Sequence, residues 1–348
     1  MVTSTSRRGL GPAVSLALAG ALALAGCGSA ETSSSGSGAQ GGQVTVKYTA
    51  GAATVTDWDD YVAEAKGFYA ANGITVDRID TQTATAATQL LVTGEAEIGR
   101  GLPPAIQAVE ASNGGVSLIS TADILIRPPF VMVTNEITDW SQLQGRTVGV
   151  SSPTDSTGVI TESALRFKGL PQGSVDLVPS GGTGSRYSAL QGGALDATLL
   201  LPPVNFTATD AGFEEIGYLP EELGPDWQAS FTSVIVNPDW AADNRPALVA
   251  FLRARDQALQ WLNDPANREE AVAILAEATQ VSPDVAGRTY DLLEIGTETS
   301  AFAPRIGVSQ KASGQVLADL QALGQASPDL TVERFLDDSY AQEARGGS

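Results

Sequence analysis

The fold is decided by one stretch, Thr147-Val148-Gly149-Val150-Ser151-Ser152-Pro153-Thr154-Asp155-Ser156-Thr157-Gly158-Val159-Ile160. It begins with a β-branched run, Thr147–Val150, which is bounded by turn residues and predicts a short buried strand. The segment from Ser151 to Gly158 is rich in hydroxyls and turn formers. From Val159 to Phe167 the apolar residues recur at helical spacing. The stretch therefore predicts a strand that passes through a polar turn into a helix.

The polar turn is a candidate anion-binding site. The first backbone N–H groups of a helix have no partner within the helix, and the helix dipole favours negative charge there. Hydroxyls from Thr154, Ser156 and Thr157 add donors for a carboxylate, sulfonate or phosphate. The alternative is that Thr154, Asp155 or Ser156 only caps the helix. If Asp155 instead faces the ligand, a zwitterion, a cation or a neutral ring is favoured over a simple anion.

The first 26 residues have the pattern of a secretory signal peptide. Arg7 and Arg8 precede an apolar run, Val14–Ala25, that is too short to form a stable transmembrane helix. The run ends in Leu24-Ala25-Gly26-Cys27, which resembles the lipobox of bacterial lipoproteins. This resemblance implies cleavage before Cys27 and a diacylglycerol on its thiol. Cys27 is the only cysteine, so it has no disulfide partner. The sequence leaves open whether export uses the Sec or the twin-arginine route.

Residues 27–43 are interpreted as the lipidated cysteine and a flexible tether, because Ala30–Gln43 is rich in Ser and Gly. Two acyl chains are enough for stable anchoring. No second apolar run is long enough to span a membrane. We therefore expect an exported protein, lipid-anchored to the outer face of the bacterial cytoplasmic membrane.

Composition excludes several classes of function. There are 20 Lys and Arg against 40 Asp and Glu, a net charge of −20, and loss of Arg7 and Arg8 with the signal peptide makes it −20 − 2 = −22. So acidic a chain is not expected to bind nucleic acid or to dock electrostatically on anionic lipid. The chain has no histidine, which excludes Ser–His and Cys–His catalysis and His-ligated metals. We expect a protein that is not an enzyme and holds no cofactor and no metal.

Short strands and helices alternate along the folded part of the chain, which predicts an α/β sheet with helices on both faces. The predicted strands are Val44–Tyr48, Ile74–Val76, Ala96–Gly99 and Val116–Ser120, and the predicted helices are Asp57–Ala71, Ala84–Thr93, 103–109, Pro246–Leu262, Arg268–Ala278 and Ser313–Leu323.

Short motifs then follow in a fixed order: Lys66-Gly67-Phe68-Tyr69, Asn72-Gly73-Ile74, Gly94-Glu95-Ala96-Glu97-Ile98-Gly99 and Pro103-Pro104-Ala105. Behind a lipobox, this series resembles the N-terminal lobe of periplasmic solute-binding proteins of ABC importers, in the nitrate, sulfonate, taurine and thiamine-pyrimidine-precursor group. The likeness continues through Leu143–Val150, Ala189–Ala197 and Pro202-Pro203, and it covers most of the chain from Val44 to about Ala278.

The resemblance implies the two-lobed type II periplasmic-binding-protein fold, in which the ligand cleft lies between two α/β lobes. We expect lobe 1 to comprise residues 44–133 and 231–348, and lobe 2 to comprise residues 134–230. The two chain crossings are expected near Pro129–Asn135 and Ser230–Asn237, which are extended and apolar.

Four loops are expected to converge on the cleft, because ligands bind at the carboxyl ends of strands in such sheets. Trp58 could stack on the ligand or merely cover the first helix. Arg100 could bind an anionic group or pair with Glu97 at the surface. Arg127 and Arg186 are further cationic candidates, expected at the surface. The predicted ligand-binding residues are Trp58, Arg100, Pro103, Pro104, Thr154, Asp155, Ser156, Thr157, Thr183, Pro203 and Asn205.

The resemblance also implies the function. We expect a monomeric solute-binding lipoprotein that delivers a small organic solute, anionic and sulfonate- or carboxylate-like, to the transmembrane permease of an ABC importer. Its partners would be the solute, the permease and, through the lipid anchor, the membrane. The alternatives are an exported enzyme or a sensory receptor on the same scaffold, or a binder of a cationic or neutral solute such as an amine or a pyrimidine precursor.

Overall fold

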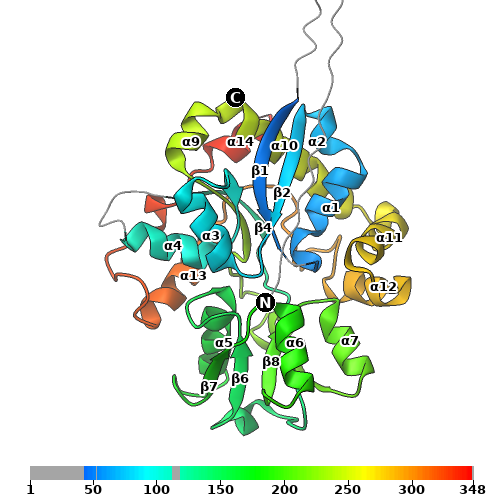
Figure 1. Cartoon of the computed structure of the whole chain (residues 1–348), viewed down its shortest axis with the longest axis vertical. Helices are drawn as coiled ribbons and strands as arrows, with labels where there is room; N and C mark the ends of the chain where they lie inside the picture. The colour runs from blue at the N-terminus through cyan, green and yellow to red at the C-terminus, as the bar shows by residue number, and fades with distance from the viewer. Residues whose placement is uncertain (1–42, 52, 112–117, 347–348) are drawn as a thin grey trace, which may run out of the picture. The chain divides into compact units, whose positions relative to one another are not determined.

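Two five-stranded sheets form the framework of the chain (Figure 1). The computed structural model describes residues 43–51, 53–111 and 118–346, all within Gly41–Ser348, one of the two units into which the chain divides. The predicted signal peptide, Cys27 and the tether up to Gly42 lie outside the described residues. Among the described residues, no helix is both long enough and apolar enough to cross a bilayer.

The first sheet is mixed and is built from distant parts of the sequence. Its strand order is β2-β1-β3-β10-β4. β1 runs parallel to β2 and β3, whereas β10 runs antiparallel to β3 and β4. The bounds are β1 Val44–Ala50, β2 Ile74–Asp80, β3 Ile98–Gly99, β4 Ile119–Leu125 and β10 Thr232–Val236.

The second sheet repeats this arrangement with strand order β7-β6-β8-β5-β9. β6 is parallel to β7 and β8, and β5 is antiparallel to β8 and β9. All of β5 pairs within this sheet, so a lobe boundary after Val133 would cut a strand, and we propose that lobe 2 begins before Val131. The bounds are β5 Val131–Thr134, β6 Thr147–Val150, β7 Asp176–Pro179, β8 Ala197–Leu200 and β9 Glu214–Tyr218.

Helices cover both faces of each sheet, as the alternating sequence pattern predicts. On the first sheet, α1, α2, α10 and α14 pack on one face, and α3, α4 and α13 pack on the other. On the second sheet, α5 packs on one face and α6 and α7 on the other. The helices are α1 Trp58–Ala65, α2 Phe68–Ala71, α3 Ala84–Thr93, α4 Leu102–Ala111, α5 Ser156–Phe167, α6 Thr183–Gln191, α7 Val204–Asp210, α8 Leu219–Glu222, α9 Pro238–Asp243, α10 Arg245–Leu262, α11 Arg268–Thr279, α12 Pro283–Leu292, α13 Gln310–Ala322 and α14 Ser339–Ala344.

Short 3-10 helices complete the chain: η1 Val55–Asp57, η2 Trp140–Leu143, η3 Pro265–Asn267 and η4 Val332–Arg334. The single helix predicted over Asp57–Ala71 is wrong in detail, because it is divided into η1, α1 and α2. The break falls at Gly67, whose φ of 69° is left-handed and strains most other residues. Because of this break, α2 does not continue α1 but packs against α10.

Trp58 lies in the core of lobe 1. Its side chain is 0% exposed, and its ring contacts Tyr290 and Phe302 edge-on at centroid distances of 6.0 and 6.4 Å. Its indole N–H donates to the carbonyl of Ala271 at 3.1 Å. Of the two roles considered for this residue, the structure places it in the packing role.

Replacement of Trp58 by Ala should therefore destabilise the protein by about 3–5 kcal/mol, because it removes a large buried side chain and leaves a cavity. The matched control is Phe167→Ala, since Phe167 is 61% exposed and its loss should change the free energy of unfolding by less than about 0.5 kcal/mol. Urea unfolding followed by circular dichroism measures both. Equal effects of the two substitutions would contradict the assignment of Trp58 to the core.

Candidate functional site

The stretch Thr147–Phe167 folds as the predicted strand, polar turn and helix: β6 leads through the turn into α5. The turn is tightly folded onto the start of α5. Thr157 Oγ1 accepts from the Ser151 backbone N–H at 2.8 Å. A Cβ on Gly158 would lie 2.4 Å from the Ser152 carbonyl oxygen and 2.5 Å from that of Pro153, so this position requires glycine.

Asp155 both caps α5 and faces the cavity, so the two roles considered for it are combined. Its Oδ1 accepts from the Ser156 backbone N–H at 2.5 Å. Its Oδ2 is buried and has no hydrogen-bond partner among the described residues. The Oγ of Ser156, also buried, has none either. The beginning of α5 therefore presents polar atoms whose hydrogen bonds are not made within the protein.

A small polar cavity lies where both lobes and both crossings meet. Its volume is about 60 Å³, which holds a few water molecules or a small solute. Hydroxyls dominate the polar part of the wall, together with three charged side chains. The lining residues are Thr54, Thr56, Gln82, Thr83, Ala84, Arg100, Gly101, Phe130, Ser151, Asp155, Ser156, Thr157, Gly182, Thr183, Arg186, Leu201 and Phe231.

Arg186 is a buried cation in the cavity wall. It is 1% exposed, and its guanidinium donates to the carbonyls of Leu199 and Gly181 and to Thr183 Oγ1 at 2.7–3.2 Å. Burial lowers the pKa of Arg186 to about 10, and the nearby Asp155 carboxylate opposes that shift. The side chain thus remains charged at neutral pH. The expectation that Arg186 lies at the surface is wrong, and so is that for Arg127, which is 5% exposed.

Arg100 faces the cavity from the loop after β3. It forms no hydrogen bond or ion pair with any described residue, and its Nε is buried without a partner. The alternative pairing with Glu97 is not formed, because Glu97 Oε2 accepts from the Lys47 backbone N–H at 2.8 Å. Arg100 therefore presents its guanidinium to the cavity without a hydrogen bond to any described residue.

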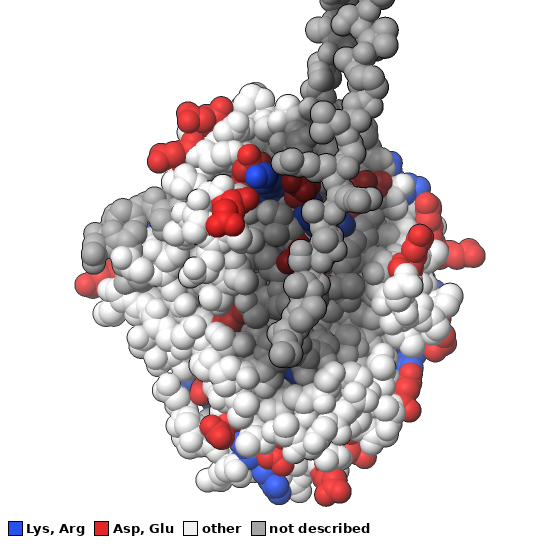
Figure 2. All heavy atoms as spheres, viewed as in Figure 1, with Lys and Arg blue, Asp and Glu red and all other residues white. Residues whose placement is uncertain are grey.

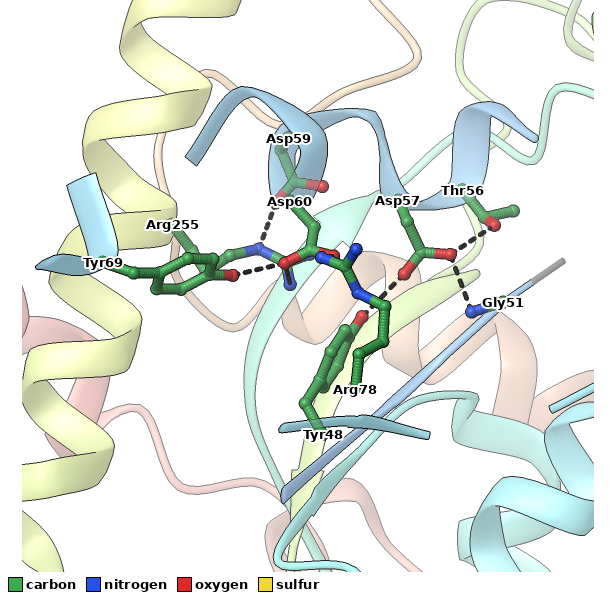
Figure 3. A network of polar contacts seen from close by, with 9 residues as sticks. All are labelled: Tyr48, Gly51, Thr56, Asp57, Asp59, Asp60, Tyr69, Arg78 and Arg255. Carbon is green, nitrogen blue, oxygen red and sulfur yellow. Dashed lines mark hydrogen bonds and ion pairs between the residues drawn. The ribbon is translucent and has the colours of Figure 1, made fainter. Parts of the chain in front are cut away.

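Asp57 lies close to Arg100 and holds Thr56, which lines the cavity. Figure 3 shows its hydrogen bonds. Its carboxylate accepts from the Tyr48 hydroxyl at 2.8 Å, the Gly51 backbone N–H at 2.9 Å and Thr56 Oγ1 at 3.0 Å. A Cβ on Gly51 would come within 2.6 Å of Asp57 Oδ2 and 2.8 Å of Arg100 Nη2. Because Gly51 has no side chain, the side chains of Arg100, Thr56 and Asp57 can lie close together. No sequence motif identified this arrangement.

The next two acidic residues hold α1 against α10 (Figure 3). Arg255 is fully buried, and its Nε donates to Asp59 Oδ2 at 2.5 Å. Asp60 accepts from the Tyr69 hydroxyl at 2.6 Å and also pairs with Arg78. Burial raises the pKa of Asp59 to about 6, although Arg255 opposes that shift. The charge of Arg255 is therefore required to keep Asp59 ionised.

The structure brings only part of the predicted site together. Arg100, Asp155, Ser156, Thr157 and Thr183 line the cavity. Pro104 lines a separate groove between α3 and α4. The remaining predicted residues are not in the cavity wall: Trp58, Pro103, Thr154, Pro203 and Asn205.

Sequence reasoning missed several wall residues. Phe130 and Phe231 lie in the two crossings, and their rings meet at a centroid distance of 5.0 Å. Gln82 and Thr83 precede α3, and Thr83 Oγ1 accepts from the Ala86 backbone N–H at 3.1 Å. The helix-capping position of Thr83 was a usable signal, because it repeats the strand–turn–helix pattern of Asp155.

The two lobes contact each other around the cavity. Arg166 of α5 pairs with Asp319 of α13 at 2.7 Å, and Arg288 of α12 pairs with Asp210 of α7 at 3.0 Å. The Val55 backbone N–H also donates to the Pro202 carbonyl at 3.2 Å. These contacts connect the two lobes.

Two mixed sheets of this topology, with a polar cavity at the crossings, define the class of type II periplasmic binding proteins. The chain belongs to the NMT1/THI5-like family, which its residues 59–268 match.

Individual proteins agree with that class. The putative binding protein YtlA of Bacillus subtilis is 24% identical over 230 residues, which are 65% of this chain and 68% of YtlA. The alkanesulfonate-binding protein SsuA from Xanthomonas axonopodis pv. citri, bound to MOPS, superposes with a TM-score of 0.67 at 16% identity, over 85% of this chain and 98% of SsuA. The desulfurization enzyme DszB superposes with a TM-score of 0.61 at 15% identity, over 87% of this chain and 99% of DszB. At such identities the two structures establish the fold alone.

Substitution of Arg255 by Met should destabilise the protein by about 3–5 kcal/mol at neutral pH, because Asp59 and Asp60 lose their buried counterion. The folded-state pKa of Asp59 lies above its unfolded value, so its contribution to stability is complete below about pH 4 and is lost as pH rises through 6. Loss of Arg255 raises that pKa further, so the deficit of the variant should grow between pH 5 and pH 7.5.

Urea unfolding at the two pH values measures this change. Arg253→Met is the matched control on the same helix, because Arg253 donates to the Ala344 carbonyl and not to a carboxylate. A deficit of Arg255→Met that does not change with pH would contradict the role assigned to Asp59.

Proposed function

We propose that the chain is the solute-binding component of an ABC-type import system and that it binds a small organic anion in the cavity between its lobes. The single observation that carries the anion assignment is Arg100, a cation that faces the cavity without a hydrogen bond or ion pair to any described residue. A guanidinium has donors suited to carboxylate or sulfonate oxygens. An anion bound there would accept the hydrogen bonds that no described residue accepts from Arg100.

Two of the three charged side chains that line the cavity are cations. Arg100 and Arg186 line it together with Asp155, the buried Asp57 carboxylate lies close to Arg100, and the chain as a whole carries −20. Figure 2 shows Asp and Glu side chains spread around the periphery of one face. Selection of an anion therefore depends on the buried cations, where the surroundings screen charge less than water does.

Family membership supports this function. The alkanesulfonate-binding neighbour, by its name, binds an organic anion, and YtlA is described as a putative binding protein. Binding without chemistry would proceed by closure of the lobes, with the ligand stabilising the closed state through its higher affinity for that state. The closed form would dock on a transmembrane permease. A lipid on Cys27 would hold the monomer at the outer face of the cytoplasmic membrane.

An enzyme is the second candidate, because the desulfurization enzyme has the same fold. This chain has no histidine, and its one cysteine is the proposed lipidation site, so catalysis would rest on carboxylates, Lys or Tyr. Incubation with each ligand followed by mass analysis separates the candidates. A binding protein returns the solute unchanged.

A thermal-shift panel tests the anion assignment. Ethanesulfonate, propionate and nitrate are compared with ethylamine, and a ligand present at about 100 times its dissociation constant should stabilise the protein by about 2.7 kcal/mol. Arg100→Gln should weaken binding of the active anion at least about tenfold, because a charge-assisted hydrogen bond is lost. Lys311→Gln removes an exposed cation remote from the cavity wall and should leave binding unchanged. Stabilisation by ethylamine alone would show that the cavity selects cations.

A further inference from the structure

Two turns from opposite lobes approach each other at the cavity wall. Gln82 lies between β2 of the first sheet and α3, and Gly182 lies between β7 of the second sheet and α6. Both residues line the cavity. A Cβ built on Gly182 would lie 2.8 Å from Gln82 Oε1 and 3.2 Å from the Gln82 carbonyl oxygen. The two lobes therefore meet at Gly182 with almost no space for a side chain.

The local backbone does not require a glycine at position 182. Its φ of −66° and ψ of 172° are extended, a conformation that any residue adopts. The three atoms nearest to the added Cβ all belong to Gln82, so the closest obstacle to a side chain is the other lobe. A Cβ on Gly184, two residues along, would meet no atom within 4 Å. The missing side chain of Gly182 thus matters for the contact between the lobes.

Hydrogen bonds hold both turns in place. In lobe 2, the buried Arg186 guanidinium donates to the Gly181 carbonyl at 2.7 Å, and the Arg186 backbone N–H donates to the Gly182 carbonyl at 3.0 Å. In lobe 1, Thr81 Oγ1 donates to the last carbonyl of β1 at 2.9 Å. The exposed side chain of Gln82 can turn away into solvent, but its carbonyl oxygen can move only with the backbone. A side chain at position 182 would therefore separate the lobes more readily than it would deform either turn.

We infer that Gly182 determines how far the two lobes close: it is a positioning residue whose missing side chain lets lobe 2 reach the backbone of lobe 1. Arg100 lines the cavity from lobe 1 and Ser156 lines it from lobe 2, so the separation of these two groups changes with the degree of closure. This inference rests on the proposed function, because closure serves binding only if a solute lies between the lobes.

Cross-linking between the lobes measures how often they reach this arrangement. Asp210 and Arg288, which pair across the cleft at 3.0 Å, are replaced in the full-length chain as Asp210→Cys and Arg288→Cys, and Cys27→Ser removes the natural thiol. A short bis-maleimide then traps closed molecules, and mass analysis follows the rate of trapping. No solute is added, so the measurement does not depend on which ligand the protein binds.

In this chain, Gly182→Asn should lower the rate of cross-linking roughly tenfold or more, because overpacking the contact disfavours the closed arrangement. Asparagine is chosen because it is a favourable N-cap residue, so the start of α6 is preserved. The matched control is Gly184→Asn, which adds the same side chain at an exposed position with space around it. The control should leave the rate unchanged, and the thermal midpoints of the two variants should agree within a few degrees.

Equal rates for Gly182→Asn and the unsubstituted chain would overturn the inference. Failure of the unsubstituted chain to cross-link would overturn it as well, since the lobes would then not reach this contact. The same loss of rate in both Asn variants would assign the effect to α6 instead of the contact with Gln82, which also contradicts the inference. Absence of stabilisation by every anion in the thermal-shift panel would refute the proposed anion binding and leave the cross-linking result unaffected.

Discussion

The structure depends on neutralising a guanidinium in the middle of lobe 1. Arg255 is fully buried and lies over the Tyr48 ring at 5.3 Å, and an unpaired charge at that depth would be strongly destabilising. Its partner Asp59 lies 196 residues earlier in the chain. The pairing requires α10 to return to α1, and the same turn of chain carries Asp57, which fixes Thr56 at the cavity and accepts from the Gly51 backbone N–H. Stability of the lobe and shape of the binding wall are thus joined in one polar network (Figure 3).

The sequence predicts features that depend on interactions between neighbouring residues, and it does not predict features that depend on contacts between distant ones. β6 and α5 are local, so periodicity predicted them, and capping chemistry gave Asp155 as one of three candidate caps. The break at Gly67 was missed because helical periodicity continues across it and only the left-handed backbone interrupts it. The burial of Arg186 and the packing of Trp58 depend on elements that approach only in three dimensions, and no spacing along the chain records them. The missing partner of Arg100 is likewise a property of the folded wall.

The cavity also shows why the fold leaves the ligand undetermined. Binding proteins and an enzyme share these two sheets, so chemistry is set by the few side chains at the crossings. Here those side chains are cations, hydroxyls and one carboxylate, and hydrogen bonds to backbone groups fix Asp155 and Arg186. Phe130 and Phe231 add an apolar patch where the crossings meet. Specificity therefore depends more on which wall atoms donate and which accept hydrogen bonds than on the size of the cavity.

The ion pairs across the cleft have a kinetic consequence. The ion pairs Arg166–Asp319 and Arg288–Asp210 connect the two lobes, so the lobes can separate only when both pairs break. The residence time of a solute bound between the lobes would then depend on this separation as well as on the contacts of the solute. The Arg288–Asp210 pair is substantially exposed and is weakened by salt, whereas Asp319 is shielded, so the two sides of the cleft respond differently to ionic strength.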